Sequence, residues 1–133
     1  MPEHVTTSEA ETAAIARDLA RSLVAGDVLL LSGNLGAGKT AFVRGLAEGL
    51  GVDPEDVSSP TFTLVHEYRG GTLTLYHADL YRLDRAATDD LGLEEFQRGV
   101  LAIEWPDRLT HALPGARHVS IEILDGDERR IVW

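Results

Sequence analysis

The sequence predicts an α/β fold, in which helices flank a central mixed sheet. Two short and wholly apolar runs, residues 28–31 and 100–103, are typical of strands buried on both faces, as in a parallel sheet. Helical patterns surround these runs, and pairs of β-rich segments joined by turns indicate hairpins. Because 133 residues with 44% hydrophobic side chains suffice for one core, we expect a single domain over residues 1–133.

Two helices are expected in the first 51 residues. Ser8 and Glu11 have the spacing of a capping box, which opens a helix, and the turn at Gly26 is expected to end it. The second helix is expected over residues 40–50, with Gly51 as its stop. The apolar face of the first helix repeats every four residues, at Ile15, Leu19 and Leu23.

The middle of the chain predicts a hairpin and a third helix. Residues 62–68 and 72–77 read as two strands around the turn Arg69-Gly70-Gly71, and the second strand has a clear period of two. Residues 86–96 predict a helix.

The last third of the chain predicts a short helix and a second hairpin. Pro106 stops the second apolar run, and residues 107–113 can form a short helix. Residues 119–124 alternate as a strand. After the turn at Asp125-Gly126, residues 129–133 are expected to pair back.

The acidic composition argues against direct binding of nucleic acid. The formal net charge is −10, whereas nucleic acids are bound mainly through Lys and Arg on phosphates. The acidity favours solubility, with an acidic face for a basic partner as the alternative. The chain has no cysteine, no apolar run of the roughly 18 residues that a membrane span needs, and no signal-peptide pattern in residues 1–11. We therefore expect a soluble cytoplasmic protein.

Residues 33–40 satisfy the phosphate-loop pattern G-x-x-x-x-G-K-[ST] at every fixed position. Their context fits, because a predicted buried strand precedes them and a predicted helix follows. Glycines let the backbone curl so that N–H groups point inward, and the dipole of the next helix points to the same place. The pattern predicts a P-loop NTPase-like domain that binds nucleotide through Gly33, Asn34, Leu35, Gly36, Ala37, Gly38, Lys39 and Thr40.

Lys39 and Thr40 have separate roles in this prediction. Lys39 is the only lysine of the chain, which indicates that its position needs a compact ammonium rather than a guanidinium. The ammonium can reach the β- and γ-phosphates, and the Thr40 hydroxyl can ligate Mg²⁺. The loop alone does not specify the nucleotide, and the lack of an N-K-x-D guanine motif favours ATP.

Two acids that follow predicted strands are candidates for contacting the magnesium ion from the side opposite the phosphate loop. Asp79 could bind Mg²⁺ directly or through water, or it could cap a turn. Glu104 ends an apolar run in the Walker-B arrangement, where it could be a general base or a metal ligand, or could reach solvent. Both positions suit a site beyond the carboxyl ends of strands. The predicted catalytic set is Lys39, Asp79 and Glu104.

Several other residues are weaker candidates. The hydroxyls of Ser58-Ser59-Pro60-Thr61 could sense the γ-phosphate, or the segment could be an ordinary turn. His66 and His77 match no zinc spacing and are expected to face polar neighbours. Three residues are expected either in the core or beside the site, namely Tyr81, Arg82 and Trp105.

Taken together and in order, these motifs resemble the TsaE family, also called YjeE, of small bacterial ATPases required for making threonylcarbamoyladenosine in tRNA. Beside the phosphate loop, the matching segments are Ser59-Pro60-Thr61-Phe62, His77-Ala78-Asp79-Leu80-Tyr81-Arg82-Leu83 and Glu104-Trp105-Pro106. The loop is shared by many NTPases, whereas the first two of these segments in this order are much more specific. Family members often run beyond the equivalent of Trp133, so a basic or flexible C-terminal tail used for docking could be short or absent here.

The resemblance implies a compact P-loop domain with ATP and Mg²⁺ as ligands. It implies that Lys39 and Thr40 contact phosphate and metal, and that Asp79 is the magnesium-side acid. Glu104 would be a catalytic or water-orienting acid, and Thr61 would belong to a loop that responds to the nucleotide. The implied partners are TsaD and TsaB, the threonylcarbamoyl-transferring pair, which the ATPase would reset or remodel.

Two other functions are compatible with the motifs. A small-molecule kinase would need an acceptor pocket and an arginine-bearing lid, for which residues 83–98, with Arg85 and Arg98, are the candidate. A non-catalytic nucleotide sensor would bind ATP with Mg²⁺ and change shape without turnover. The preferred prediction is an ATPase that is slow alone and faster beside its partner.

Overall fold

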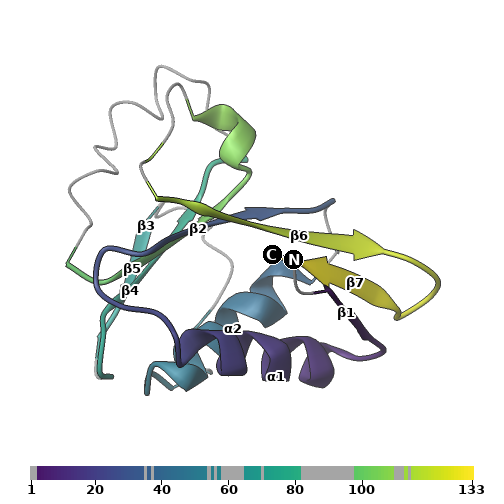
Figure 1. The fold of residues 1–133 in the computed structure, drawn as a ribbon, viewed down its shortest axis with the longest axis horizontal. Helices are drawn as coiled ribbons and strands as arrows, with labels where there is room; N and C mark the ends of the chain where they lie inside the picture. The colour runs from purple at the N-terminus through teal and green to yellow at the C-terminus, as the bar shows by residue number, and fades with distance from the viewer. Residues whose placement is uncertain are drawn as a thin grey trace.

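In the part of the chain that the structure describes, seven strands form one mixed sheet in the order β1-β7-β6-β2-β5-β4-β3 (Figure 1). The computed structural model describes residues 3–34, 36, 38–53, 55, 57, 65–69, 71–81, 98–109, 113 and 115–133. The strands are β1 Glu3–Thr6, β2 Val28–Ser32, β3 Val65–Tyr68, β4 Leu75–Asp79, β5 Val100–Glu104, β6 Arg117–Ile123 and β7 Arg129–Val132. The helices are α1 Glu9–Ala20, α2 Lys39–Gly49 and the 3₁₀ turn η3 Pro106–Arg108.

The centre of the sheet is parallel and its edges are antiparallel. Strand β2 pairs in parallel with β5 on one side and β6 on the other, and β4 continues the parallel set beside β5. Strands β3 and β7 join this set by antiparallel hairpins. The predicted mixed α/β sheet is therefore confirmed, with the two apolar runs as its central strands.

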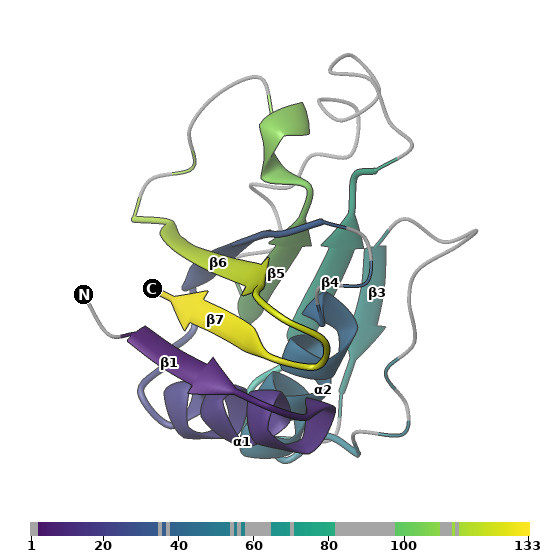
Figure 2. The ribbon, with the colours of Figure 1, turned by 90° about the vertical axis from the view of Figure 1, so that its right-hand side faces the viewer.

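Both described α-helices lie side by side on the same face of the sheet (Figures 1 and 2). Alternate residues of the central strands divide the core in two. Leu29 and Leu31 of β2 pack on the helix side with Phe42 of α2, while Leu30 of β2 and Ile103 of β5 pack on the opposite side. All five side chains are buried. This packing holds the carboxyl ends of β2 and β5 next to the start of α2.

Helix α1 begins as predicted and ends earlier than predicted. The Ser8 hydroxyl accepts the N–H of Glu11 at 3.1 Å, and the Glu11 carboxylate accepts the N–H of Thr7, one residue before the usual capping-box partner. The expected end at Gly26 was wrong, because the helix stops at Ala20. There the Ser22 hydroxyl donates to the Leu19 carbonyl and competes with the helical ladder.

Strand β4 differs from its prediction in extent and in burial. It runs from Leu75 rather than residue 72, and its first four residues are all buried instead of alternating. The reason is that both faces of the strand are covered, because Leu75 packs in the core on the helix side while Tyr76 and Ala78 pack in the core on the opposite side. Its last residue is Asp79, which lies next to the end of β5.

The N-terminal strand and the segment after β5 were not predicted correctly. Strand β1 was missed, because its four residues carry little pattern of their own and are ordered by antiparallel pairing with β7. Of the expected helix at 107–113, the structure has only the 3₁₀ turn Pro106–Arg108. The predicted helix at 86–96 lies outside the described residues. In the described part of the chain, no helix is long and apolar enough to cross a membrane.

Candidate functional site

A cavity of about 300 Å³ opens where β4 and β5 end and α2 begins. Ligands of open α/β sheets bind at this edge, beyond the carboxyl ends of the strands. The structure brings most of the predicted site residues together here. The cavity lining includes Gly36, Gly38, Lys39, Thr40, Asp79 and Glu104.

The loop before α2 has the curled backbone that its glycines predict. Gly36 has φ +80° and Gly38 has φ +106°, a region that residues with a Cβ rarely adopt. Gly33 does not share this conformation, and its carbonyl oxygen instead accepts a hydrogen bond from Lys39. Leu35 and Ala37 lie outside the described residues. The N-terminus of α2 therefore opens on the cavity without a side-chain cap, so its free N–H groups are available to an anion.

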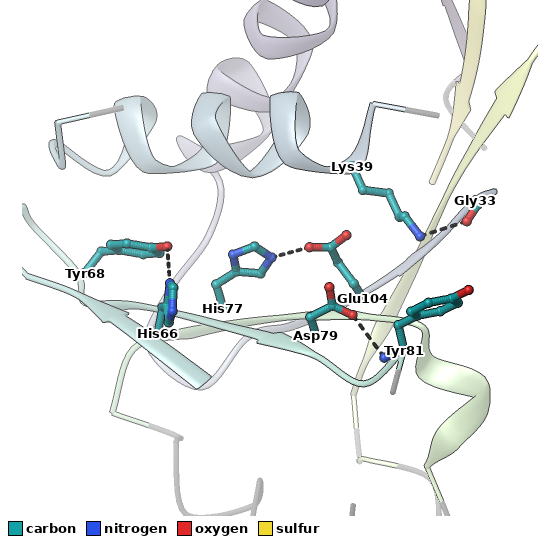
Figure 3. Close-up of polar contacts among 8 residues, drawn as sticks. All are labelled: Gly33, Lys39, His66, Tyr68, His77, Asp79, Tyr81 and Glu104. Atoms are coloured by element: carbon teal, nitrogen blue, oxygen red, sulfur yellow. Dashed lines mark hydrogen bonds and ion pairs between the residues drawn. The ribbon is translucent and has the colours of Figure 1, made fainter. Parts of the chain in front are cut away.

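Lys39 is the first residue of α2, and its ammonium is enclosed at the base of the loop (Figure 3). Its Nζ donates to the Gly33 carbonyl oxygen at 2.8 Å and lies 3.8 Å from the centre of the Trp105 ring. Burial lowers the pKa of this ammonium, and the carboxylates of Glu104 and Asp79 partly offset that effect. The lysine is thus a desolvated cation that two acids and an aromatic face stabilise.

Asp79 and Glu104 are the last residues of two neighbouring parallel strands and lie opposite each other in the register. Asp79 accepts the N–H of Tyr81 at 3.0 Å. Burial is the main cause that raises the pKa of Asp79, and the negative charge of Glu104 adds to it. Glu104 is 4% exposed, and its Oε2 lies 2.5 Å from Nε2 of the fully buried His77. Figure 3 shows both carboxylates on the side of the sheet that carries Lys39.

The oxygen atoms of this cavity fit the chemistry of magnesium. Thr40, Asp79 and Glu104 all line it and offer one hydroxyl and two carboxylates. Magnesium prefers oxygen ligands and usually keeps several waters, with only one or two carboxylates from the protein. Within the described ranges no group of three or more His, Cys, Asp or Glu side chains converges so that it could hold a metal ion.

Trp105 and Tyr81 lie beside the site, which resolves an alternative that the sequence left open. Both line the cavity, and their ring centres are 4.8 Å apart. Trp105 has φ +61°, which is strained for a residue with a Cβ, and it precedes Pro106. The strained turn directs the indole under the Lys39 ammonium. Part of the same ring packs on the core opposite the helices.

Three residues of the cavity lining were not identified from the sequence, namely Glu9, Ala41 and Arg44. Glu9, at the start of α1, reaches the phosphate loop only through the packing of the two helices. Arg44 could have been identified from the sequence, because it follows Thr40 by four residues and so lies on the same face of α2. The candidates Thr61 and Arg82 lie outside the described residues.

A second cavity of about 280 Å³ also borders the phosphate loop. It shares Gly36 and Gly38 with the first cavity, so the two meet at the loop. Arg129 of β7 reaches the loop there, with its Nη2 3.4 Å from the Gly36 carbonyl oxygen. The remaining lining is mostly polar and includes Thr7, Ser8, Thr12 and Asp127.

Asp79→Asn is expected to stabilise the protein at neutral pH. Because the pKa of Asp79 is raised above its ordinary 3.8, ionising it costs more in the folded chain than in the unfolded chain. The parent protein therefore loses folding stability as pH rises through the raised pKa of Asp79. The Asp79→Asn protein has no proton to lose at this position, so its stability does not fall in this way. The amide oxygen of asparagine can still accept the N–H of Tyr81. Thermal unfolding should show a melting temperature higher by about 2–5 °C at pH 7.

The difference in melting temperature between Asp79→Asn and the parent protein should disappear as pH falls below the ordinary pKa of 3.8, where Asp79 is protonated in both the folded and the unfolded chain. Asp125→Asn is the matched control, because it removes the same charge from an exposed turn between β6 and β7. An Asp79→Asn protein that melts at or below the parent temperature at pH 7 would show that ionised Asp79 stabilises the fold.

The mixed sheet with a parallel centre, the glycine-curled loop and the helix that starts at Lys39 define an α/β domain of the P-loop NTPase type. Comparison with known proteins gives the particular family. The family model described as Threonylcarbamoyl adenosine biosynthesis protein TsaE matches residues 6–132. The chain therefore belongs to the TsaE family, as the resemblance of its motifs predicted.

Relatives and a solved structure agree with this membership. The chain is 45% identical to the tRNA threonylcarbamoyladenosine biosynthesis protein TsaE of Bacillus subtilis, with 96% of this chain and 82% of the relative covered. It is 41% identical to the protein of the same name from Aquifex aeolicus, with 98% and 94% covered. The crystal structure of Bacillus subtilis YdiB superposes with a TM-score of 0.80 at 40% identity, covering 98% of this chain and 82% of that chain.

Proposed function

We propose that the chain binds Mg-ATP at the phosphate loop and hydrolyses it in tRNA threonylcarbamoyladenosine formation, together with TsaD and TsaB. One observation carries the proposal: Lys39, Asp79 and Glu104 line a single cavity at the start of α2. A loop that only joined a strand to a helix would not need a buried ammonium facing two carboxylates. Family membership supplies the biological process.

In the proposed complex, the polyphosphate lies in the curl of the loop, where backbone N–H groups and the N-terminus of α2 bind its oxygens. The Lys39 ammonium exchanges the Gly33 carbonyl and the Trp105 ring for phosphate oxygens. Thr40 and Asp79 are the residues that would hold magnesium, which neutralises charge on the phosphates when bound. Arg44, which lines the same cavity, adds a positive charge on the side of the helix.

Glu104 is proposed as the residue that orients the attacking water. Its carboxylate accepts a proton from water as the water oxygen bonds to the γ-phosphorus, and the bond from that phosphorus to the bridging oxygen breaks. The products are ADP and inorganic phosphate. The cavity lies against Trp105 and Tyr81, whose rings limit access of bulk water from one side.

The second cavity gives the nucleoside half of ATP a place beside the loop. Its hydroxyl-bearing lining, with Thr7, Ser8 and Thr12, suits a ribose and a base edge. The choice of ATP over GTP continues to rest on the lack of an N-K-x-D motif.

TsaD and TsaB remain proposed partners, because the TsaE family name implies only a role in the same pathway. The formal charge of −10 favours contact with a protein over direct contact with tRNA. The cytoplasmic location expected from the sequence is part of the same proposal.

Phosphate release from Mg-ATP, measured with and without purified TsaD and TsaB, tests this function. We expect slow release by the chain alone and a rate at least about tenfold higher with both partners, since hydrolysis that serves a complex is completed by that complex. GTP in place of ATP is the nucleotide control. Tight ATP binding with no phosphate release in either condition would instead indicate a nucleotide sensor. Formation of ADP that requires an added metabolite, without release of phosphate, would indicate a kinase, because a kinase transfers the phosphoryl group to that acceptor.

A further inference from the structure

His77 is a fully buried histidine whose place in the fold is set by the sheet. It lies on β4 two residues before Asp79, so both side chains project from the same face of the strand. In the register His77 lies opposite Ala102 of β5, two residues before Glu104. The imidazole and the Glu104 carboxylate are therefore diagonal neighbours across two parallel strands, on the face that carries the phosphate loop (Figure 3).

The contact between these two side chains is short and specific. Nε2 of His77 lies 2.5 Å from Oε2 of Glu104, and a carboxylate has no hydrogen to donate, so the ring donates. The bond uses one carboxylate oxygen, and the other, Oε1, makes no hydrogen bond to the residues that the structure describes. A hydrogen bond to an ionised group inside a protein is stronger than one between neutral groups, so it can fix the rotamer of the acid.

The other ring nitrogen shows that packing alone does not explain this histidine. Nδ1 is buried and has no hydrogen-bond partner within the described part of the chain. A buried polar atom left without a partner costs free energy, and an apolar side chain of similar volume would avoid that cost. The feature of His77 that an apolar side chain would lack is its Nε2–H, which donates the hydrogen bond to Glu104.

We infer that His77 is a positioning residue for Glu104, acting through the hydrogen bond from Nε2 to Oε2. This inference rests on the proposed hydrolysis, in which Glu104 orients water, and it assigns His77 to the turnover step rather than to nucleotide binding. Without the bond, the carboxylate can rotate toward the Lys39 ammonium, which lies across the same cavity. Residues that orient a catalytic or metal-binding group in this way typically change activity by about 10- to 100-fold when removed.

The test compares two substitutions in the full chain, beside TsaD and TsaB. His77→Leu removes the donor and keeps an apolar side chain of similar volume, whereas His77→Gln keeps an N–H at about the reach of Nε2. We expect His77→Leu to lower the single-turnover rate about 10- to 100-fold and to change the dissociation constants for ATP and ADP less than about threefold. His77→Gln should return the rate to within about fivefold of the parent.

His66→Leu is the matched control. His66 lies directly opposite His77 in the pairing of β3 with β4. The Nδ1 atom of His66 is hydrogen-bonded with the Tyr68 hydroxyl at 3.0 Å, and His66 makes no contact with Glu104 among the described residues. Its turnover should stay within about twofold of the parent. If His77→Leu does not fold, as judged by thermal unfolding, His77→Met replaces it, because methionine also lacks the donor and packs more adaptably.

A combination with Glu104→Gln separates positioning from packing. If His77 acts through the carboxylate, His77→Leu should have no further effect on turnover once that carboxylate is an amide. The inference is overturned by parent-like turnover of His77→Leu, by equal losses in the Leu and Gln variants, or by the same loss in the Glu104→Gln background. A parent chain without turnover in any condition would overturn the proposed function as well, whereas the three results above leave that function standing.

Discussion

Lys39→Ala should weaken the binding of ATP and ADP by about 10- to 100-fold, the cost of one hydrogen-bonded charge. Lys39 is the only lysine of the chain, and it lies at the base of the loop with 5% of its surface exposed. Alanine preserves the helix, since it is the best helix former. It leaves no positive charge at the base of the loop to bind the phosphate oxygens. Isothermal titration with each nucleotide, with and without magnesium, measures the change.

The matched control for Lys39→Ala is Arg17→Ala. It changes the net charge by the same amount and, among the described residues, breaks only the exposed ion pair between Arg17 and Glu48. Such pairs contribute little, so the control should bind nucleotide like the parent and melt within a few degrees of it. Because burial lowers the pKa of Lys39, its removal relieves a desolvated charge and should not destabilise the fold. Parent-like affinity of Lys39→Ala would place the phosphates elsewhere.

Glu104→Gln should reduce ATP turnover about 100-fold or more while nucleotide affinity changes only a few-fold. Glutamine keeps the volume of this buried side chain, and its amide oxygen can still accept from His77. It cannot take a proton from water, so the loss falls on the chemical step. Single-turnover phosphate release beside TsaD and TsaB gives the rate, and titration with a non-hydrolysable ATP analogue gives the affinity.

The same variant separates the two roles that the sequence left open for Glu104. If the residue is the base, magnesium should still strengthen nucleotide binding as it does in the parent; if it is a metal ligand, that effect should shrink. Glu48→Gln is the control, because Glu48 is an exposed acid on α2 away from the cavity. Turnover of Glu104→Gln equal to that of the parent would remove Glu104 from the reaction.

The parts of the fold predicted correctly are those whose signal is local. Strands β2 and β5 are unbroken apolar runs, and the loop between β2 and α2 is recognisable because phosphate binding needs particular residues at fixed spacing. The carboxyl ends of such strands meet at one edge of a parallel sheet, so Asp79 and Glu104 could be placed near Lys39 from the sequence. The cavity that they line confirms that they come together.

The parts that were wrong or missed depend on distant segments. Strand β1 is ordered by pairing with β7, more than 120 residues later in the chain. Strand β4 loses its alternation because core side chains from distant segments pack on both its faces. Helix α1 was predicted to extend to Gly26 because Leu23 continues its apolar period. Leu23 is indeed buried, but it lies in the segment that follows the helix and not in the helix itself. Periodicity reports which residues are buried and not which backbone conformation buries them.

By itself, the sequence determined the fold class, the phosphate loop and the acids beside it, because each depends on residue types within a few positions of one another. Only the tertiary structure decided that Trp105 lies under the Lys39 ammonium and that His77 holds Glu104. Contacts of this kind arise from strand register and from one strained turn, which bring together side chains up to 66 residues apart. The register of these strands is set by the packing of whole hydrophobic faces and by turn geometry, so it depends on segments that lie far apart in the chain.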